Sequence, residues 1–127
     1  MRDEHIWVEP VGSVIVARIR GKPTAEILRE CERRVLELAR ETQHVRLLYD
    51  ALELEAPEIE VVRLQQQLEA DRQTNLGPAS LRTAILVRNT RIADLSRIAF
   101  GRVGEANYRV FYNDLGAALK WLEDLAG

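Results

Sequence analysis

The sequence predicts an α/β fold, with helices packed on a single, mixed and mostly parallel five-stranded sheet. The first observation is residues 44–51 (HVRLLYDA), an almost continuous apolar run that includes an aspartate near its end. Such a run is typical of a parallel strand buried on both faces, which needs helices above and below it. The second observation is that helical and strand-like patterns alternate along the rest of the chain, in the order ββαβαβαβα.

Four further strands complete the predicted sheet. Residues 5–10 (HIWVEP) alternate in polarity and stop at Pro10, which predicts an edge strand because proline cannot donate a ladder hydrogen bond. A tight turn joins them to residues 13–20, so an antiparallel hairpin is expected. Strand patterns recur at residues 81–88 and 107–112, each after a helical pattern. Three strand–helix–strand units predict parallel pairing through right-handed crossovers.

The helices are expected from apolar residues spaced three and four apart. Thr24 is the candidate N-cap of the first, and the second is expected over residues 58–73. Asn89 and Thr90 are predicted to cap the third helix, and Asn113 the fourth. Glycines in residues 101–104 should end the third helix, and residues 74–80 should form the longest loop. Charged residues between the apolar positions of the first helix are interpreted as a solvated face: Glu30, Glu32, Arg33, Arg34, Glu37 and Arg40.

Length and composition narrow the class of protein. The 127 residues fit one domain, residues 1–127, that is large enough to bury a core. The single cysteine, Cys31, excludes an internal disulfide and is expected to be buried. The 18 basic and 20 acidic residues are interspersed, which argues against nucleic acid as a partner. The N-terminal residues lack the apolar core of a signal peptide, and no apolar run approaches the ~20 residues of a membrane span, so a cytoplasmic location is expected.

Three local patterns carry a resemblance to a known family. They are residues 21–24 (GKPT) after the second strand, residues 47–50 (LLYD) in the central strand, and residues 108–122 (YRVFYNDLGAALKWL) at the end of the chain. Together with the element order, they resemble STAS domains, most closely the bacterial SpoIIAA-like branch. The resemblance implies a non-enzymatic, regulatory protein-binding module.

The sequence departs from that family at its regulatory position. The resemblance implies a phosphorylatable serine at the start of the second helix, where a phosphate would add about −1.5 to −2 charges and release the partner. From Ala51 to Gln73 there is neither serine nor threonine. This stretch begins instead with four glutamates: Glu53, Glu55, Glu58 and Glu60. They either complement the helix dipole or form a permanently charged surface for a protein partner.

The SpoIIAA-like branch is also similar in fold to lipid-carrying domains of the CRAL-TRIO type, which implies an apolar ligand or a peripheral membrane contact. The third helix would supply the apolar stripe: Ile92, Leu95, Ile98, Ala99 and Phe100, with Trp121 as a further candidate. Arg91, Arg97 and Arg102 could meet anionic head groups. The alternative is that the stripe is ordinary core. The predicted partner or membrane surface therefore comprises Glu55, Glu58, Ile92, Leu95 and Arg97.

A small-ligand site is expected at the carboxyl ends of the parallel strands. The candidate residues there are Lys22, Thr24, Asp50, Arg88, Asn89, Thr90 and Arg91. A helix N-terminus flanked by Arg88 and Arg91 could hold an anion, although simple capping of the helix explains Asn89 and Thr90 equally. Asp50 could orient a substrate or could simply form a turn. An enzyme would need a deep polar pocket that holds Asp50 together with Lys22 or Arg88.

Catalysis has little support in the sequence. His5 and His44 lack metal-ligand spacing, and the serines lack the context of a nucleophile elbow. We therefore predict no catalytic residue, no metal site and no cofactor. The leading interpretation is a binding or regulatory module that acts through a protein partner or a small apolar or anionic ligand; the alternative is a lipid-binding or membrane-associating carrier domain. The edge strand with Trp7 could also pair two copies into a homodimer, unless Trp7 covers the core from the sheet face.

Overall fold

The computed structural model describes residues 5–76, 81–100 and 107–124. Its element order confirms the predicted ββαβαβαβα arrangement. The elements are β1 (Ile6–Val11), β2 (Val14–Ile19), α1 (Ala25–Thr42), β3 (Arg46–Asp50), α2 (Ile59–Leu76), β4 (Arg82–Val87), α3 (Thr90–Phe100), β5 (Tyr108–Tyr112) and α4 (Leu115–Glu123). The expected end of the third helix at residues 101–104, and residues 77–80 of the predicted loop, lie outside the described residues. Residues 74–76, which were predicted to begin that loop, instead continue α2.

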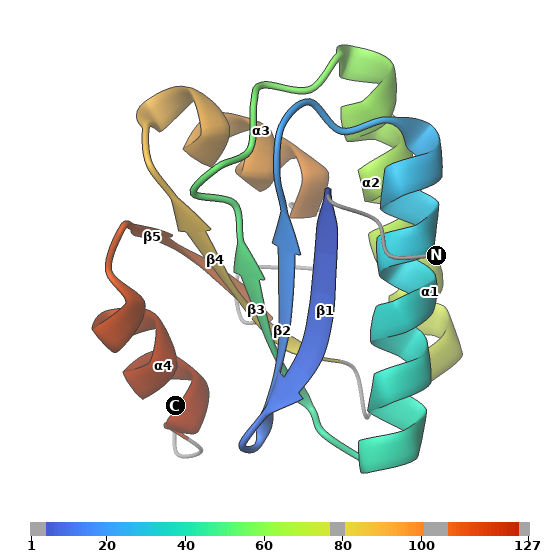
Figure 1. Cartoon of the computed structure of the whole chain (residues 1–127), viewed down its shortest axis with the longest axis vertical. Coiled ribbons are helices and arrows are strands. Elements are labelled where there is room, and N and C mark those ends of the chain that lie inside the picture. The colour runs from blue at the N-terminus through green and yellow to red at the C-terminus, as the bar shows by residue number, and fades with distance from the viewer. Residues whose placement is uncertain (1–4, 77–80, 101–106, 125–127) are drawn as a thin grey trace.

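The five strands form one sheet in sequential order, β1-β2-β3-β4-β5 (Figure 1). β1 pairs antiparallel with β2 across the turn at Gly12 (φ 61°), and the remaining pairs are parallel, as predicted. β1 continues one residue past Pro10 to Val11, where we expected it to stop. The strand tolerates this proline because β1 has a neighbour on one side only.

Sequential order explains how the helices are distributed. Each crossover, through α1, α2 and α3, advances by one strand in the same direction, so right-handed crossovers place all three helices on one face of the sheet. α4 follows the last strand without a crossover and covers the opposite face (Figure 1). β3 lies at the centre, where Leu47 and Tyr49 face the larger core and Leu48 faces α4. The prediction of a central strand buried on both faces is confirmed.

Two of the predicted helix caps are correct and one is wrong. Thr24 Oγ1 accepts a hydrogen bond from the Ile27 amide (3.2 Å), and Asn89 Oδ1 accepts one from the Ile92 amide (2.9 Å). At α4 the cap is Asp114, whose carboxylate accepts from the Ala117 amide at 2.9 Å. Asn113 adopts a left-handed conformation (φ 45°) instead and turns the chain from β5 into the helix. Asparagine accepts this conformation more readily than most residues do.

The C-terminal end of α4 is held by two arginines from the sheet. Arg46 Nε donates to the Leu122 carbonyl (2.7 Å), and Arg82 donates to the Trp121 carbonyl (3.0 Å from Nη2). Arg82 also stacks on the Trp121 ring, 3.8 Å from its centroid. Arg46 and Arg82 are partners in the β3–β4 register, so both reach the same helix end, where positive charge complements the dipole. Among the described helices, none is both long and apolar enough to cross a membrane.

Candidate functional site

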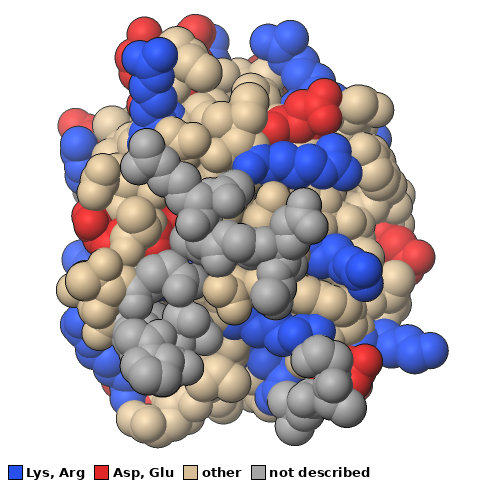
Figure 2. Space-filling model, turned by 180° about the vertical axis from the view of Figure 1, so that it is seen from behind, with Lys and Arg blue, Asp and Glu red and all other residues tan. Residues whose placement is uncertain are grey.

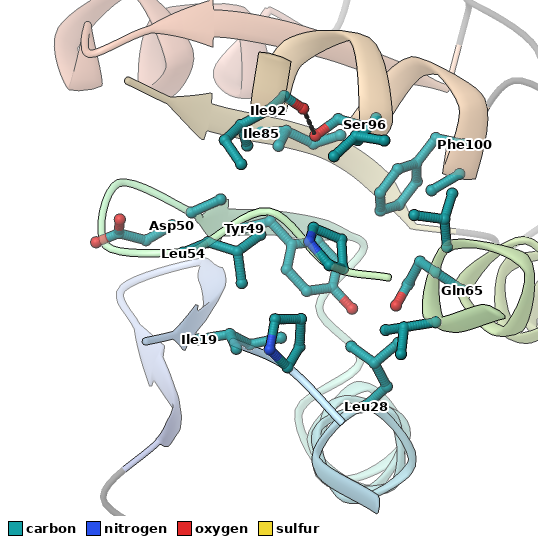
Figure 3. Close-up of a pocket in the computed structure, with 17 residues that line it drawn as sticks. Ile19, Leu28, Tyr49, Asp50, Leu54, Gln65, Ile85, Ile92, Ser96 and Phe100 are labelled. Carbon is teal, nitrogen blue, oxygen red and sulfur yellow. Dashed lines mark hydrogen bonds between the residues drawn. The ribbon is translucent and has the colours of Figure 1, made fainter. Parts of the chain in front are cut away.

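An apolar cavity of about 80 Å³ lies toward the carboxyl ends of β2, β3 and β4, beneath α2 and α3 (Figure 3). Its walls include Leu28 from α1, Leu54 from the segment after β3, Val62 from α2, and Ile92, Leu95 and Phe100 from α3. Tyr49 crosses its interior and packs edge-on against Phe100, with the ring centroids 5.7 Å apart. The predicted edge of the sheet therefore does contain a hollow, and its lining is mainly hydrocarbon.

The polar side chains at this cavity already have partners. Ser96 Oγ donates to the Ile92 carbonyl (2.8 Å), and Gln65 Nε2 donates to Glu69 (2.7 Å). The Asp50 carboxylate points away from the other labelled side chains (Figure 3); it accepts from Arg18 Nε at 2.9 Å and from the Leu52 amide at 3.1 Å. A polar pocket that would hold Asp50 together with Lys22 or Arg88 is therefore not formed. Lys22 pairs with Glu58, and Arg88 is exposed.

A buried cluster of charges adjoins the cavity. Arg72 of α2 is 2% exposed and binds Glu32 of α1 through both Nε (2.7 Å) and Nη2. Its Nη2 also donates to Glu69 (2.9 Å) and to the Tyr49 hydroxyl (3.3 Å). Burial raises the pKa of Glu69 to about 7 because the low-dielectric interior disfavours a carboxylate. Burial also raises the pKa of the neighbouring Cys31 thiol to about 12, so the predicted buried cysteine is an inert one.

This cluster was not predicted from the sequence, and the expectation that Glu32 lies on the solvated face of α1 is wrong. Glu32 is 5% exposed, since it lies four residues after Leu28 and three before Val35, on the buried stripe of α1. The spacing of Glu32 from Leu28 and Val35 in the sequence could have indicated that it is buried. The partner of Glu32, Arg72, lies 40 residues away in the sequence, so pattern alone could not pair them.

The acidic stretch forms a surface that we call the acidic edge: Glu53, Glu55, Glu58 and Glu60, all exposed. Backbone hydrogen bonds fix it to the turn after β2, where Gly21 donates to the Glu53 carbonyl (3.0 Å) and accepts from the Glu55 amide (2.9 Å). Gly21 has a φ of 73°, which favours glycine at this turn. The Lys22–Glu58 ion pair raises the pKa of Lys22 and lowers that of Glu58, mainly through their hydrogen bond.

The other predicted ligand-binding residues gather at the start of α3. Arg88, Asn89, Thr90 and Arg91 are all exposed there, and the Asn89 side chain caps the helix. Thr24 is likewise occupied as the cap of α1. Lys22 lies at the acidic edge, and Asp50 is bound to Arg18. The structure thus separates the predicted ligand-binding residues into distinct groups.

The predicted membrane surface does not form on α3 as a single stripe. Ile92 is 2% exposed and Leu95 is half-buried, and both line the cavity. Ile92 is therefore not a surface residue. Arg97 is exposed and pairs with Asp94 (3.2 Å). Trp121 belongs to α4, on the opposite face of the sheet from α3, where its ring packs near Phe111.

The surface charges follow the even mixture in the sequence. Figure 2 shows the side opposite to that of Figure 1, with basic side chains standing in separate groups among acidic and uncharged ones. On β1, Trp7 is half-buried, and the Arg18 guanidinium lies 5.6 Å from the centroid of its ring.

Comparisons with known proteins agree on one fold. Three similar structures are an anti-sigma factor antagonist from Mycobacterium paratuberculosis (14% identity, 94% of this chain and 93% of that chain covered, TM-score 0.65), SpoIIAA in its unphosphorylated form (12%, 94% and 99%, 0.64), and a serine-to-glutamate variant of RsbS from Moorella thermoacetica (17%, 97% and 98%, 0.67). Likeness at such low identity establishes the fold alone. No curated protein sequence matches the chain.

A family profile adds evidence from the sequence itself. The profile described as SpoIIAA-like matches residues 14–123, which is most of the chain and includes all elements from β2 to α4. The resemblance carried by residues 21–24, 47–50 and 108–122 is thereby confirmed. The chain belongs to the SpoIIAA-like family.

Proposed function

We propose that this chain is a non-enzymatic regulatory module that binds a protein partner through its acidic edge. The observation that carries the proposal is that four exposed glutamates lie together within residues 53–60, before and at the start of α2. Arg20 pairs with Glu53 and Lys22 pairs with Glu58, so four carboxylates face two cations and the surface stays acidic. The segment that bears them is tied to the turn after β2 by two backbone hydrogen bonds and by the Lys22–Glu58 pair. A fixed acidic surface suits a partner with a basic surface, because complementary charge steers association and selects the partner.

At the acidic edge, glutamates take the place of a residue whose charge phosphorylation could change. Similar structures include SpoIIAA in its unphosphorylated form and an RsbS variant with glutamate in place of a serine. In this chain, residues 51–73 contain no hydroxyl that a kinase for serine or threonine could modify, and they already contain glutamates. The proposed module therefore keeps one charge state at this edge. Control of its binding would come from the supply of the partner or from another part of the molecule.

The test compares two triple variants with equal changes in charge. Affinity capture with the wild-type chain identifies a partner, and the dissociation constant of the purified pair is then measured. Replacing Glu55, Glu58 and Glu60 by glutamine should weaken binding roughly tenfold or more and reduce its salt dependence. Replacing the exposed Glu37, Glu41 and Glu123 by glutamine should leave binding almost unchanged. Equal affinity of the two variants, or the lack of any specific partner, would reject the proposal.

The cavity supports a second candidate function, the binding of a small apolar ligand. Its lining of aliphatic and aromatic side chains offers little to hold ordered water, and such cavities accept apolar molecules. Native mass spectrometry of the purified chain would detect a bound molecule. Ala99→Leu, which adds bulk at the cavity wall, should abolish the added mass, whereas Ala70→Leu on α2 should retain it. A clean mass for the wild-type chain at low collision energy would count against this candidate.

A further inference from the structure

The buried cluster next to the cavity joins three elements that are far apart in the sequence. Arg72 of α2 contacts Glu32 of α1, Glu69 of its own helix and Tyr49 of β3. Glu32, Glu69 and Arg72 are each at most 5% exposed. The contact between Arg72 and Glu32 links α1 to α2 in the interior, where Leu28 of α1 and Val62 of α2 belong to the same apolar core.

The charges in this cluster do not balance when both carboxylates are ionised. One guanidinium faces two carboxylates, and the third group that acts on Glu69 besides Arg72 and Glu32 is the neutral Gln65 amide. The Tyr49 hydroxyl and the Cys31 thiol lie in the same cluster, and burial keeps both of them neutral. An uncompensated charge in the interior is costly, so a proton on one carboxyl group makes the cluster neutral. The hydrogen bonds within the cluster indicate which of the two carboxyl groups carries the proton. Glu32 receives two hydrogen bonds from Arg72, whereas Glu69 receives one from Arg72 and one from the neutral Gln65.

We propose that Glu69 is a proton-operated latch, which fastens α2 to α1 when it is protonated and loosens α2 when the proton leaves. This inference goes beyond the proposed function, because it concerns movement of α2 and is independent of any partner. α2 bears Val61, Val62 and Gln65 of the cavity wall, and its first turn carries Glu60 of the acidic edge. Loosening α2 would therefore open the cavity and release the support of that edge.

The direction of the effect follows from proton linkage. Glu69 has a pKa of about 7 in the folded chain, above the ordinary value of 4.5. The folded state therefore retains a proton that an opened state loses, and the latch is fully closed at low pH. Between about pH 5 and pH 7 the opening constant of α2 should rise roughly tenfold per pH unit, and above pH 7 it should level off.

Hydrogen exchange of the α2 amides, corrected for the intrinsic effect of pH, measures this opening constant. In the wild-type protein, the opening constant of α2 should rise from pH 5 to about pH 7 and then stay level up to pH 8. Glu69→Gln, which keeps a neutral side chain of the same shape, should remove the pH dependence and stay protected. Asp71→Asn, which removes a carboxylate at an exposed position of the same helix, should behave as wild type. Flat exchange in the wild type, or an unchanged profile in Glu69→Gln, would overturn the proposal.

A direct titration keeps the test decisive even if Glu69→Gln does not fold. Carbon-13 NMR of the side-chain carboxyl groups in the wild-type chain reports each glutamate separately. The Glu69 signal should move with a midpoint near pH 7. A Glu69 midpoint near 4.5, or a proton carried by Glu32 instead, would contradict the assignment of the latch to Glu69.

Discussion

Loss of Arg72 should destabilise the chain severely, because its guanidinium binds both Glu32 and Glu69 in the interior. Arg72→Met keeps much of the side-chain volume but leaves two buried carboxylates without their cation. Breaking a buried ion pair in this way costs about 3–5 kcal/mol of unfolding free energy. Urea unfolding at pH 8 should show this loss, and the loss should be smaller at pH 5, where protons can neutralise the carboxylates.

Arg63→Met is the matched control on the same helix. Arg63 is exposed, so its replacement should change the unfolding free energy by about 0.5 kcal/mol or less. If Arg72→Met unfolds with the same midpoint as Arg63→Met, the buried cluster does not stabilise the fold.

Two neighbouring residues of this cluster, Cys31 and Glu32, show which burial the sequence could predict and which it could not. Cys31 was predicted to be buried because an apolar-like side chain at a core position of a helix needs no special partner. The prediction for Glu32, its neighbour, was wrong because a charged side chain is ordinarily exposed to solvent. Glu32 can be buried because it pairs with Arg72, which is distant in the sequence. The pattern of α3 left its apolar residues open between the core and a ligand or membrane surface. Whether they line a cavity depends on α2, which the α3 pattern does not describe.

At the scale of elements, the boundary between β5 and α4 depends on two adjacent residues with different tasks. Asp114 caps the helix, and Asn113 supplies the left-handed turn before it. Asp114→Ala should cost about 1 kcal/mol, because the Ala117 amide loses its acceptor. Thermal unfolding monitored by circular dichroism would measure the loss.

Asn113→Gly is the informative companion to that substitution. Glycine adopts positive φ without strain, so this variant should be as stable as the wild type or slightly more stable. If Asn113→Gly lowers the stability more than Asp114→Ala does, Asn113 and not Asp114 is the N-cap of α4. Both residue types cap helices and both tolerate turns, so the sequence predicted the boundary to within one residue but not the division of roles.

At the scale of the whole molecule, the order of the strands determines how the layers are built. The sequence predicted five strands, parallel crossovers and a doubly covered centre, because each depends on periodicity within a short stretch. It did not predict that β1 to β5 would lie in sequential order. That order places α1, α2 and α3 together on one face, where they enclose the cavity and the buried cluster, and leaves the other face to α4.

Two adjacent residues of β3 allow a comparison of how much each of the two helix layers contributes to stability. Leu47 faces the three-helix layer and Leu48 faces α4, and they are 0% and 4% exposed. Because both side chains are buried, Leu47→Ala and Leu48→Ala should each cost about 2–5 kcal/mol in urea unfolding. Val45→Ala, at a position 41% exposed just before the strand, should cost much less. A Leu48→Ala variant as stable as Val45→Ala would mean that α4 contributes little to the stability of the sheet, and that the centre of the molecule is effectively covered from one side.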